Sequence, residues 1–177
     1  MRRCAALVVV FLALEPAWAV AEVRDASANG FTVTVALTIH ATPTEVYHRL
    51  VYNVGKWWNP EHTYSHNAHN LIIEEKAMGC FCEKLPHGMV RHMEVVYFDP
   101  GKSLGLTGAL GPLQLIAAGG NRRVDLTPAP EGTKLDVTYA VFGYLPKGMT
   151  TWAAPVDSVL TEQFTRLKAY LEGGRRH

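Results

Sequence analysis

Glu83 and His92 are candidates for acid and base chemistry because they lie on neighbouring segments that the sequence predicts to be β-strands, Cys80 to Leu85 and Met89 to Phe98. The turn residues Pro86-His87-Gly88 between them predict an antiparallel hairpin, which would bring the two side chains near each other. A carboxylate beside an imidazole can move a proton to and from a bound molecule. The alternative is a cross-strand pair whose members only satisfy each other's hydrogen-bonding groups.

Three histidines, His62, His66 and His69, follow one another at spacings of four and three residues. On a helix this spacing would gather the rings on one face, as a zinc or copper site requires. Their neighbours are Thr, Tyr, Ser and Asn, which favour turns over helices. We therefore expect a polar loop whose histidines face solvent or a pocket opening. We assign no cofactor, and keep the three histidines as an alternative metal site.

Several other side chains are candidates to line a binding site. Trp57 and Trp58 are adjacent in an irregular connection, so one buried stripe cannot take both, and we expect at least one at a pocket entrance. In the flexible apolar segment Gly108 to Gln114, the Gln114 amide can orient a polar ligand group, although a bulged strand would also explain this segment. The candidate ligand-binding residues are Trp57, Trp58, His62, Tyr64, Gln114, Phe142 and Phe164.

Cys80 and Cys82 lie two residues apart on a predicted strand, so their side chains share one face. An extended strand holds two such side chains too far apart for easy closure of a disulfide. We expect two small buried side chains, with a strained disulfide as the alternative.

The first 21 residues resemble a secretory signal peptide. Arg2 and Arg3 precede an apolar run from Cys4 to Leu14, and small residues at Ala17, Ala19 and Ala21 predict cleavage after Ala19 or Ala21. The apolar run is shorter than the about 20 residues that a membrane-spanning helix needs. We predict a periplasmic or secreted protein with no stable membrane insertion after cleavage, and one domain over residues 22–177.

Composition and missing motifs exclude several function classes. The chain has 177 residues, of which 48% are hydrophobic and 19% charged, and this is typical of one packed domain. A net charge of +1 gives no electrostatic basis for nucleic-acid binding. The sequence contains no phosphate loop, dinucleotide fingerprint, nucleophile elbow or Cys-x-x-Cys motif, so nucleotide chemistry and covalent catalysis have no support.

The elements that would position these residues follow a clear order. Phe31 to His40 alternates apolar and polar residues, which predicts a strand. Thr42-Pro43-Thr44-Glu45 has the form of a capping box that opens a helix through Leu50. Further strands are expected at Leu71–Glu75, Cys80–Leu85, Met89–Phe98, Ser103–Thr107, Leu113–Ala118, Arg122–Thr127 and Lys134–Gly143, with turns that include Gly119-Gly120-Asn121 and Pro128 to Gly132.

The last predicted element is an amphipathic helix. Val156, Leu160, Phe164, Leu167 and Leu171 recur at helical spacing, with Pro155 suited to the first turn. We therefore predict an α+β helix-grip fold. A curved antiparallel sheet wraps around a long C-terminal helix, two short helices follow the first strand, and a cavity lies between helix and sheet.

In this order of elements the chain resembles the START-like superfamily, also called SRPBCC. The resemblance runs from Phe31 to Leu171 and rests on Thr42 to Tyr47, the Trp57-Trp58 pair, Met78 to Glu83 and the final helix. It is strongest to the polyketide-cyclase-like and heat-shock-ATPase-activator-like branches, and it implies a helix-grip fold with a hydrophobic pocket. An exported protein would not meet the cytosolic chaperone, so we do not expect the activator's activity.

Two functions follow as expectations. The first is binding of a small hydrophobic or amphipathic molecule in the cavity by a protein that is a monomer or a weak homodimer. The second is a cyclase-like or hydrolase-like enzyme with Glu83 and His92 as acid and base in the same cavity. A third class, binding of a protein partner, would need an exposed apolar patch.

Overall fold

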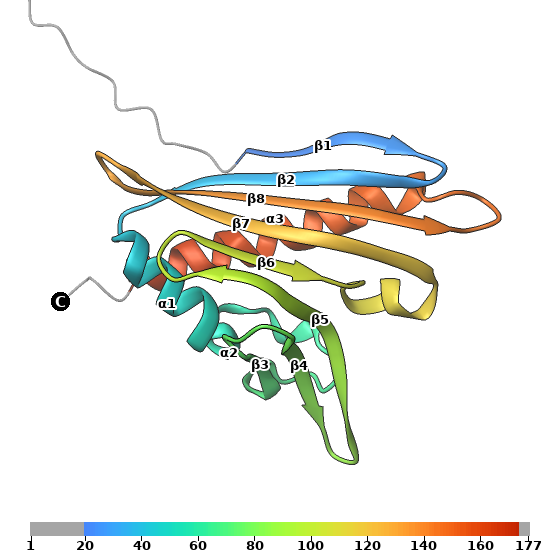
Figure 1. The fold of residues 1–177 in the computed structure, drawn as a ribbon, viewed down its shortest axis with the longest axis horizontal. Coiled ribbons are helices and arrows are strands. Elements are labelled where there is room, and N and C mark those ends of the chain that lie inside the picture. Colours follow the sequence, from blue (N-terminus) through green and yellow to red (C-terminus); the bar gives the residue numbers. More distant parts are fainter. Residues whose placement is uncertain (1–19, 174–177) are drawn as a thin grey trace, which may run out of the picture.

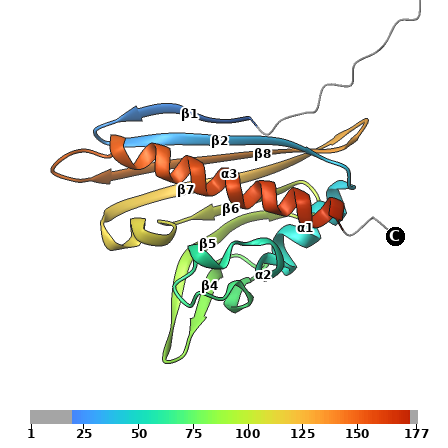
Figure 2. The same cartoon turned by 180° about the vertical axis from the view of Figure 1, so that it is seen from behind.

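The computed structural model describes residues 20–173, which form an eight-stranded antiparallel sheet with a long helix across one face (Figures 1 and 2). The strands are β1 Val20–Ser27, β2 Gly30–Ile39, β3 Leu71–Ile73, β4 Gly79–Leu85, β5 Gly88–Asp99, β6 Ser103–Thr107, β7 Ala117–Ala129 and β8 Gly132–Tyr144. The α-helices are α1 Pro43–Tyr52, α2 Val54–Trp57 and α3 Thr150–Gly173, and the 3-10 helices are η1 Pro60–His62, η2 Ala68–Asn70 and η3 Gly111–Leu115.

The sheet order is β1-β2-β8-β7-β6-β5-β4-β3, with antiparallel neighbours throughout. The sheet curves, and α3 packs against the concave face, as Figure 2 shows. This arrangement confirms the predicted α+β helix-grip fold, including the two short helices α1 and α2.

Alternating burial along the strands builds the sheet side of the core. In β2, Phe31, Val33, Val35, Leu37 and Ile39 are all buried, and the residues between them are more exposed. This period of two is what one buried face requires. The structure confirms the strand predicted at Phe31 to His40.

The α1 cap forms as the sequence predicts. The Thr42 hydroxyl accepts a hydrogen bond from the backbone N–H of Glu45 at 3.3 Å, and Pro43 occupies the first helical position. The cap satisfies a donor that the helix itself leaves free.

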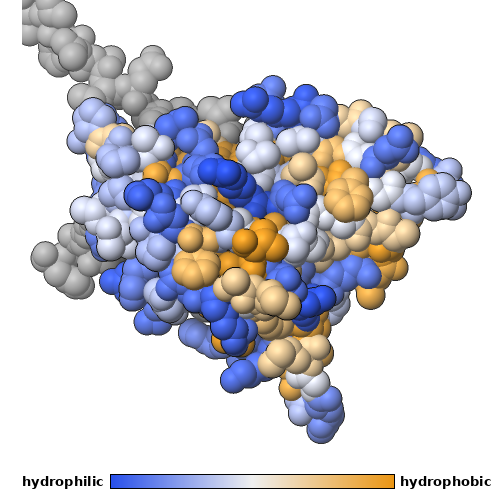
Figure 3. Space-filling view, viewed as in Figure 1, coloured by the Kyte–Doolittle hydropathy of each residue, from blue (hydrophilic) through white to orange (hydrophobic). Residues whose placement is uncertain are grey.

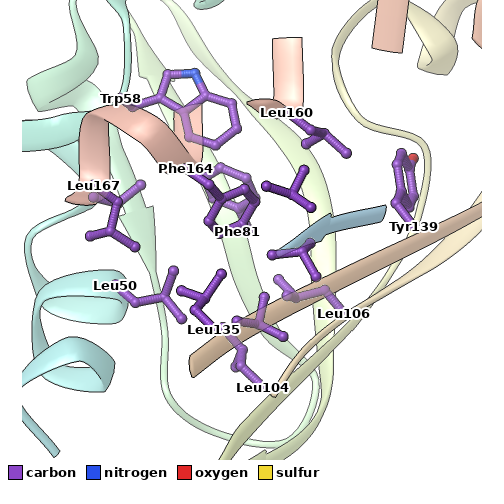
Figure 4. Close-up of a cluster of buried hydrophobic side chains, with 14 of the residues drawn as sticks. Leu50, Trp58, Phe81, Leu104, Leu106, Leu135, Tyr139, Leu160, Phe164 and Leu167 are labelled. Carbon is purple, nitrogen blue, oxygen red and sulfur yellow. The ribbon is translucent and has the colours of Figure 1, made fainter. Parts of the chain in front are cut away.

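The helix side of the core comes from one stripe of α3. Leu160, Phe164, Leu167 and Leu171 are buried, and Figure 4 shows the first three of these facing side chains of the sheet. The helix begins at Thr150, earlier than predicted, so Pro155 lies inside it instead of in its first turn. A proline so near the N-terminus removes one backbone hydrogen bond without ending the helix.

The strand predicted at Arg122–Thr127 is part of the longer strand β7, whereas the strand predicted at Leu113–Ala118 is wrong. The predicted strand at Leu113–Ala118 is instead the 3-10 helix η3 followed by the start of β7. Gly111 adopts a left-handed φ of 58° and Pro112 follows it, which turns the chain into η3. A short apolar run of this kind does not by itself distinguish strand from helix.

The predicted turn at Gly119-Gly120-Asn121 lies inside β7. Aromatic rings from β8 cover the two glycines. A Cβ atom would lie 2.8 Å from the ring of Phe142 at Gly119, and 2.8 Å from that of Tyr139 at Gly120. These glycines therefore make room for neighbouring rings, as glycine often does within a strand.

The strand β1 is an additional finding at the sheet edge. It pairs with β2 from Val20 onwards, and its first two residues fall inside the predicted signal peptide. The rest of that prediction, residues 1–19, lies outside the described residues. Within residues 20–173 no helix is both long and apolar enough to cross a membrane.

The structure corrects the expectation for the two neighbouring cysteines. Cys80 and Cys82 form a disulfide, and their Cα atoms lie 5.3 Å apart. This separation is within the range that a disulfide spans. The ladder between β4 and β5 is irregular beside Cys82, where its register shifts. Such local irregularity is invisible to a pattern that assumes an evenly extended strand.

Candidate functional site

A cavity of about 250 Å³ lies between the N-terminal part of α3, the segment that follows α2, and η3. Most of its wall is apolar. The apolar wall consists of Trp58, Leu71, Phe81, Leu110, Pro112, Leu113, Trp152, Pro155, Val156, Val159 and Leu160, together with Gly111. The polar lining residues are Glu61, His62, Thr63 and Tyr64, all in the segment that follows α2, and His92 on β5. An apolar wall with a few convergent polar groups is typical of small-molecule sites.

His92 reaches the cavity because it is the extra residue of a β-bulge. Cys82 pairs with Arg91, and Phe81 pairs with Met93, so His92 has no partner in the ladder. As a result His92 and Met93 are both buried although they are consecutive. A bulge redirects a side chain in this way without ending the strand.

Behind His92, the carboxylate of Glu83 is fully buried and fully engaged. It accepts hydrogen bonds from the backbone N–H groups of Tyr64 at 3.0 Å and Ser65 at 2.5 Å, and His92 Nε2 lies 3.0 Å from its Oε2. Burial by itself raises the pKa of Glu83, but the hydrogen bonds from Ser65, Tyr64 and His92 outweigh it and hold the pKa below its ordinary value. Glu83 is therefore an ionised anchor for His92.

The imidazole of His92 is held neutral. Burial is the largest cause of its lowered pKa, and the charge of Arg122 adds to it, whereas Glu83 acts in the opposite direction. A neutral ring that donates from Nε2 to Glu83 presents Nδ1 as an acceptor. The amide Nε2 of Gln114 lies 3.5 Å from this Nδ1, a long and weak contact. Nδ1 of His92 is thus a hydrogen-bond acceptor beside Gln114, and it can take up a proton.

Two aromatic rings pack against the imidazole of His92. The Tyr64 ring stacks on His92 at 5.9 Å between centroids, and Phe81 packs against it at 5.3 Å. Both rings also line the cavity. The structure therefore brings together Glu83, His92 and Tyr64, three of the residues that the sequence singled out.

Only some of the remaining predicted ligand-binding residues line the cavity. Trp58 and His62 line the cavity, whereas Gln114 borders a second, polar cleft of about 300 Å³ on the other side of His92. Trp57 and Phe164 do not line the cavity; they pack on each other in the core, with ring centroids 6.1 Å apart.

The prediction for Phe142 is corrected most clearly. Its side chain is 60% exposed, and it follows Val141, which is buried on the concave face. Phe142 therefore lies on the outer face of the sheet, away from α3. In Figure 3, which views the molecule as in Figure 1, this side is a mixture of polar and apolar residues, with apolar residues gathered near the centre.

The three histidines of the alternative metal site are not gathered. His62 Nε2 lies 3.0 Å from Glu162 Oε2, His66 is an exposed residue with a left-handed φ of 52°, and His69 belongs to η2. Over residues 20–173 no three His, Cys, Asp or Glu side chains group closely enough to hold a metal ion. The segment is a loop with short 3-10 turns, so helical spacing does not apply to it.

Contacts with α3 hold the loop that contains Asn59 and His62 in place beside the cavity. Glu162 accepts hydrogen bonds from Asn59 Nδ2 at 2.5 Å and from His62, and Gln163 Oε1 accepts one from the backbone N–H of Asn59 at 2.7 Å. We call this group of four residues the loop clasp. Burial raises the pKa of Glu162, but the hydrogen bonds from Asn59 and His62 outweigh this and lower it. Glu162 is therefore an ionised carboxylate within the loop clasp.

Sequence reasoning missed Arg122, which is buried on the concave face. A usable signal was present, because Arg122 and Arg123 are adjacent on a predicted strand and must point to opposite faces. It also missed Trp152, Val156 and Val159 as wall residues. Their position in the first turns of the last helix becomes informative only when the packing of that helix is known.

Comparison with known proteins supports the fold and goes no further. No family model matches the chain, and no curated protein matches it. Among solved structures, a conserved protein of unknown function from Enterococcus faecalis is 20% identical with a TM-score of 0.59, over 90% of this chain and 80% of that one. An uncharacterised protein from Rhizobium leguminosarum is 13% identical with a TM-score of 0.63, over 88% and 99% of the two chains. A protein from Nitrosomonas europaea is 14% identical with a TM-score of 0.57, over 82% and 97%.

Proposed function

We propose that this protein binds a small hydrophobic or amphipathic molecule in the cavity between α3 and the concave face of the sheet. The observation that carries the proposal is the wall of the cavity, which is apolar except for His92 and the residues from Glu61 to Tyr64. Binding is favourable when an apolar ligand displaces water from a surface of this kind. The polar groups at His92 and Tyr64 would orient one end of the ligand.

Several narrower statements belong to the same proposal. We infer membership of the START-like superfamily in its polyketide-cyclase-like or heat-shock-ATPase-activator-like branch, which the helix-grip fold supports. We also infer export to the periplasm or medium, with the protein acting as a monomer or weak homodimer. Cell fractionation followed by N-terminal sequencing tests export: a chain in the periplasm or medium that starts at Val20 or Glu22 would support it, whereas a chain that stays in the cytoplasm with an intact Met1 would contradict it.

The binding test uses the neutral fluorescent probe N-phenylnaphthylamine. Val159 lines the cavity, so Val159→Phe should fill part of it and weaken probe binding by about tenfold or more. The matched control is Val96→Phe, because Val96 is 54% exposed, and it should bind like the wild type. Native mass spectrometry should show one organic molecule per chain. No probe binding by the wild type, or equal binding by both variants, would contradict the proposal.

Acid and base catalysis is the second candidate, and the Glu83–His92 contact at 3.0 Å favours it. A buried carboxylate that orients a histidine is a common arrangement for a general base. A suitable probe is the exchange of α-hydrogens of β-tetralone in heavy water, followed by NMR. Catalysis predicts exchange that Glu83→Gln and His92→Gln both slow at least about tenfold. Wild-type exchange at the buffer rate would refute proton abstraction from this ketone.

A further inference from the structure

Arg122 is a buried cation that forms no ion pair with the described residues. Its side chain extends from β7 toward the concave face, between neighbours Leu106 on β6 and Tyr139 on β8, and only 4% of the residue is exposed. Its Nε and Nη1 atoms have no hydrogen-bond partner among residues 20–173. No ion pair of the described residues includes it.

The adjacent arginine shows the ordinary arrangement. Arg123 points to the outer face, where its Nε lies 2.7 Å from an oxygen of Asp125 and its side chain is 66% exposed. A guanidinium on the surface is hydrated and easily paired. The same group at Arg122 has neither advantage, so burial there is costly unless something compensates the charge.

Arg122 nevertheless keeps its charge near neutral pH. Burial lowers its pKa to about 10, and the neighbouring Tyr139 phenol acts weakly in the opposite direction. The guanidinium carbon lies 5.4 Å from the centre of the Phe81 ring, a cation–π contact that offsets only part of the cost. The buried carboxylate of Glu83 forms no ion pair with Arg122, and its oxygens accept hydrogen bonds from Tyr64, Ser65 and His92.

The unpaired charge adjoins the proposed ligand cavity. Phe81, whose ring contacts Arg122, is a wall of the cavity, and Figure 4 shows this ring at the centre of the core between sheet and α3. His92, another wall residue, also experiences the charge of Arg122. Arg122 does not line the cavity itself, so the pairing proposed below requires the Phe81 ring to move when the ligand binds.

We propose that the ligand of this cavity is a small carboxylate with an apolar body, and that Arg122 is the counter-ion of its carboxylate. This inference rests on the proposed binding function and narrows it to an anionic amphipath. The apolar body lies in the cavity and contacts wall residues such as Trp58, Trp152 and Val159. The carboxylate pairs with the free N–H groups of Arg122, whose planar fork fits two carboxylate oxygens. Few water molecules compete there, so the attraction is only weakly screened.

The test compares two probes that share one ring system, naphthoate and naphthylmethanol, at mildly alkaline pH. Binding is followed by calorimetry and by tryptophan fluorescence, because Trp58 and Trp152 line the cavity. We expect the wild type to bind naphthoate at least about tenfold more tightly than the alcohol. Arg122→Met should remove this preference while leaving alcohol binding within about twofold. The control Arg123→Met changes the net charge equally and should keep the wild-type preference.

The outcomes separate the two proposals. Binding of neither probe by the wild type would refute the binding function together with this inference. Equal binding of both probes by the wild type would refute the carboxylate inference and leave the binding function standing. An acid preference that survives in Arg122→Met, or disappears in Arg123→Met, would assign the effect elsewhere and overturn the role of Arg122. If Arg122→Met does not fold, Arg122→Lys replaces it, and there the preference must fall because the fork is lost.

Discussion

His92 Nε2 lies 3.0 Å from Glu83 Oε2 although the two residues do not face each other in the β4–β5 ladder. Glu83 pairs with Val90. His92 lies further along β5 than Val90 and is the unpaired residue of the bulge. The bulge gives His92 a place in the cavity wall, and Glu83 remains fully buried behind it. The contact therefore connects the interior of the sheet with the candidate site.

Removing the charge of Glu83 should destabilise the protein. Glu83→Gln keeps the shape, but its amide N–H₂ would face the backbone N–H of Tyr64 or Ser65, which are donors themselves. Hydrogen bonds to a charged group contribute about 1.5–3 kcal/mol each, so we expect a loss of about 2 kcal/mol or more in the free energy of unfolding. Urea unfolding measures it.

Glu131→Gln is the matched control for this substitution. Glu131 lies in the exposed turn between β7 and β8, and a surface change of this kind alters stability by less than about 0.5 kcal/mol. Equal stability of Glu83→Gln and Glu131→Gln would show that the carboxylate of Glu83 is not held as described.

Acid should weaken the fold in two separate pH ranges. Because burial lowers the pKa of His92, the unfolded chain takes up a proton below about pH 6.5 that the folded protein does not. The His92 contribution is therefore complete above that pH and is lost as the pH falls toward the folded pKa. The pKa of Glu83 is lowered too, so its contribution is present above about pH 4.3 and is lost only as the pH falls through the folded pKa.

The variant His92→Gln separates these ranges. Its unfolding free energy should change less than that of the wild type between about pH 6.5 and pH 5, and the loss at lower pH should persist. His87→Gln, in the exposed turn between β4 and β5, is the control and should follow the wild-type profile. An unchanged slope for His92→Gln near pH 6 would disprove the assignment.

Opening the loop clasp should speed ligand exchange more than it affects stability. Glu162→Ala removes the acceptor of Asn59 and His62, and partly exposed pairs of this kind contribute less than about 1 kcal/mol to stability. We expect faster dissociation of N-phenylnaphthylamine in stopped-flow measurements, and faster hydrogen exchange over residues 59–64. Glu172→Ala, near the other end of α3, is the control. Unchanged dissociation would mean that the clasp does not limit exit.

Peptide mapping by mass spectrometry should find Cys80 and Cys82 joined in the isolated protein. The relation between loop length and chain entropy gives about 1.6 kcal/mol for so short a loop. The double variant Cys80→Ala with Cys82→Ala should therefore lose at most about this much stability in urea, and keep the fold. A peptide with two free thiols would contradict the disulfide.

Local patterns in the sequence were sufficient for most of the fold. The alternation in Phe31 to His40, the cap at Thr42 and the helical stripe that ends at Leu171 each depend on near neighbours in the chain, and the structure confirms all three. The hairpin at Pro86-His87-Gly88 also determined correctly that Glu83 and His92 meet. These features need only the periods of strand and helix together with turn chemistry.

Tertiary structure decided what local patterns leave open. The bulge at His92, the disulfide in β4 and the position of Phe142 on the outer face depend on how strands align and curve around α3. The histidine spacing that would suit a metal on a helix has no meaning in a loop. The sequence by itself thus determined most of the elements, their order and the proximity of Glu83 to His92. Only the packing of distant segments decided which side chains enclose the cavity and left Arg122 buried without an ion pair among the described residues, because burial and charge compensation are properties of the whole fold.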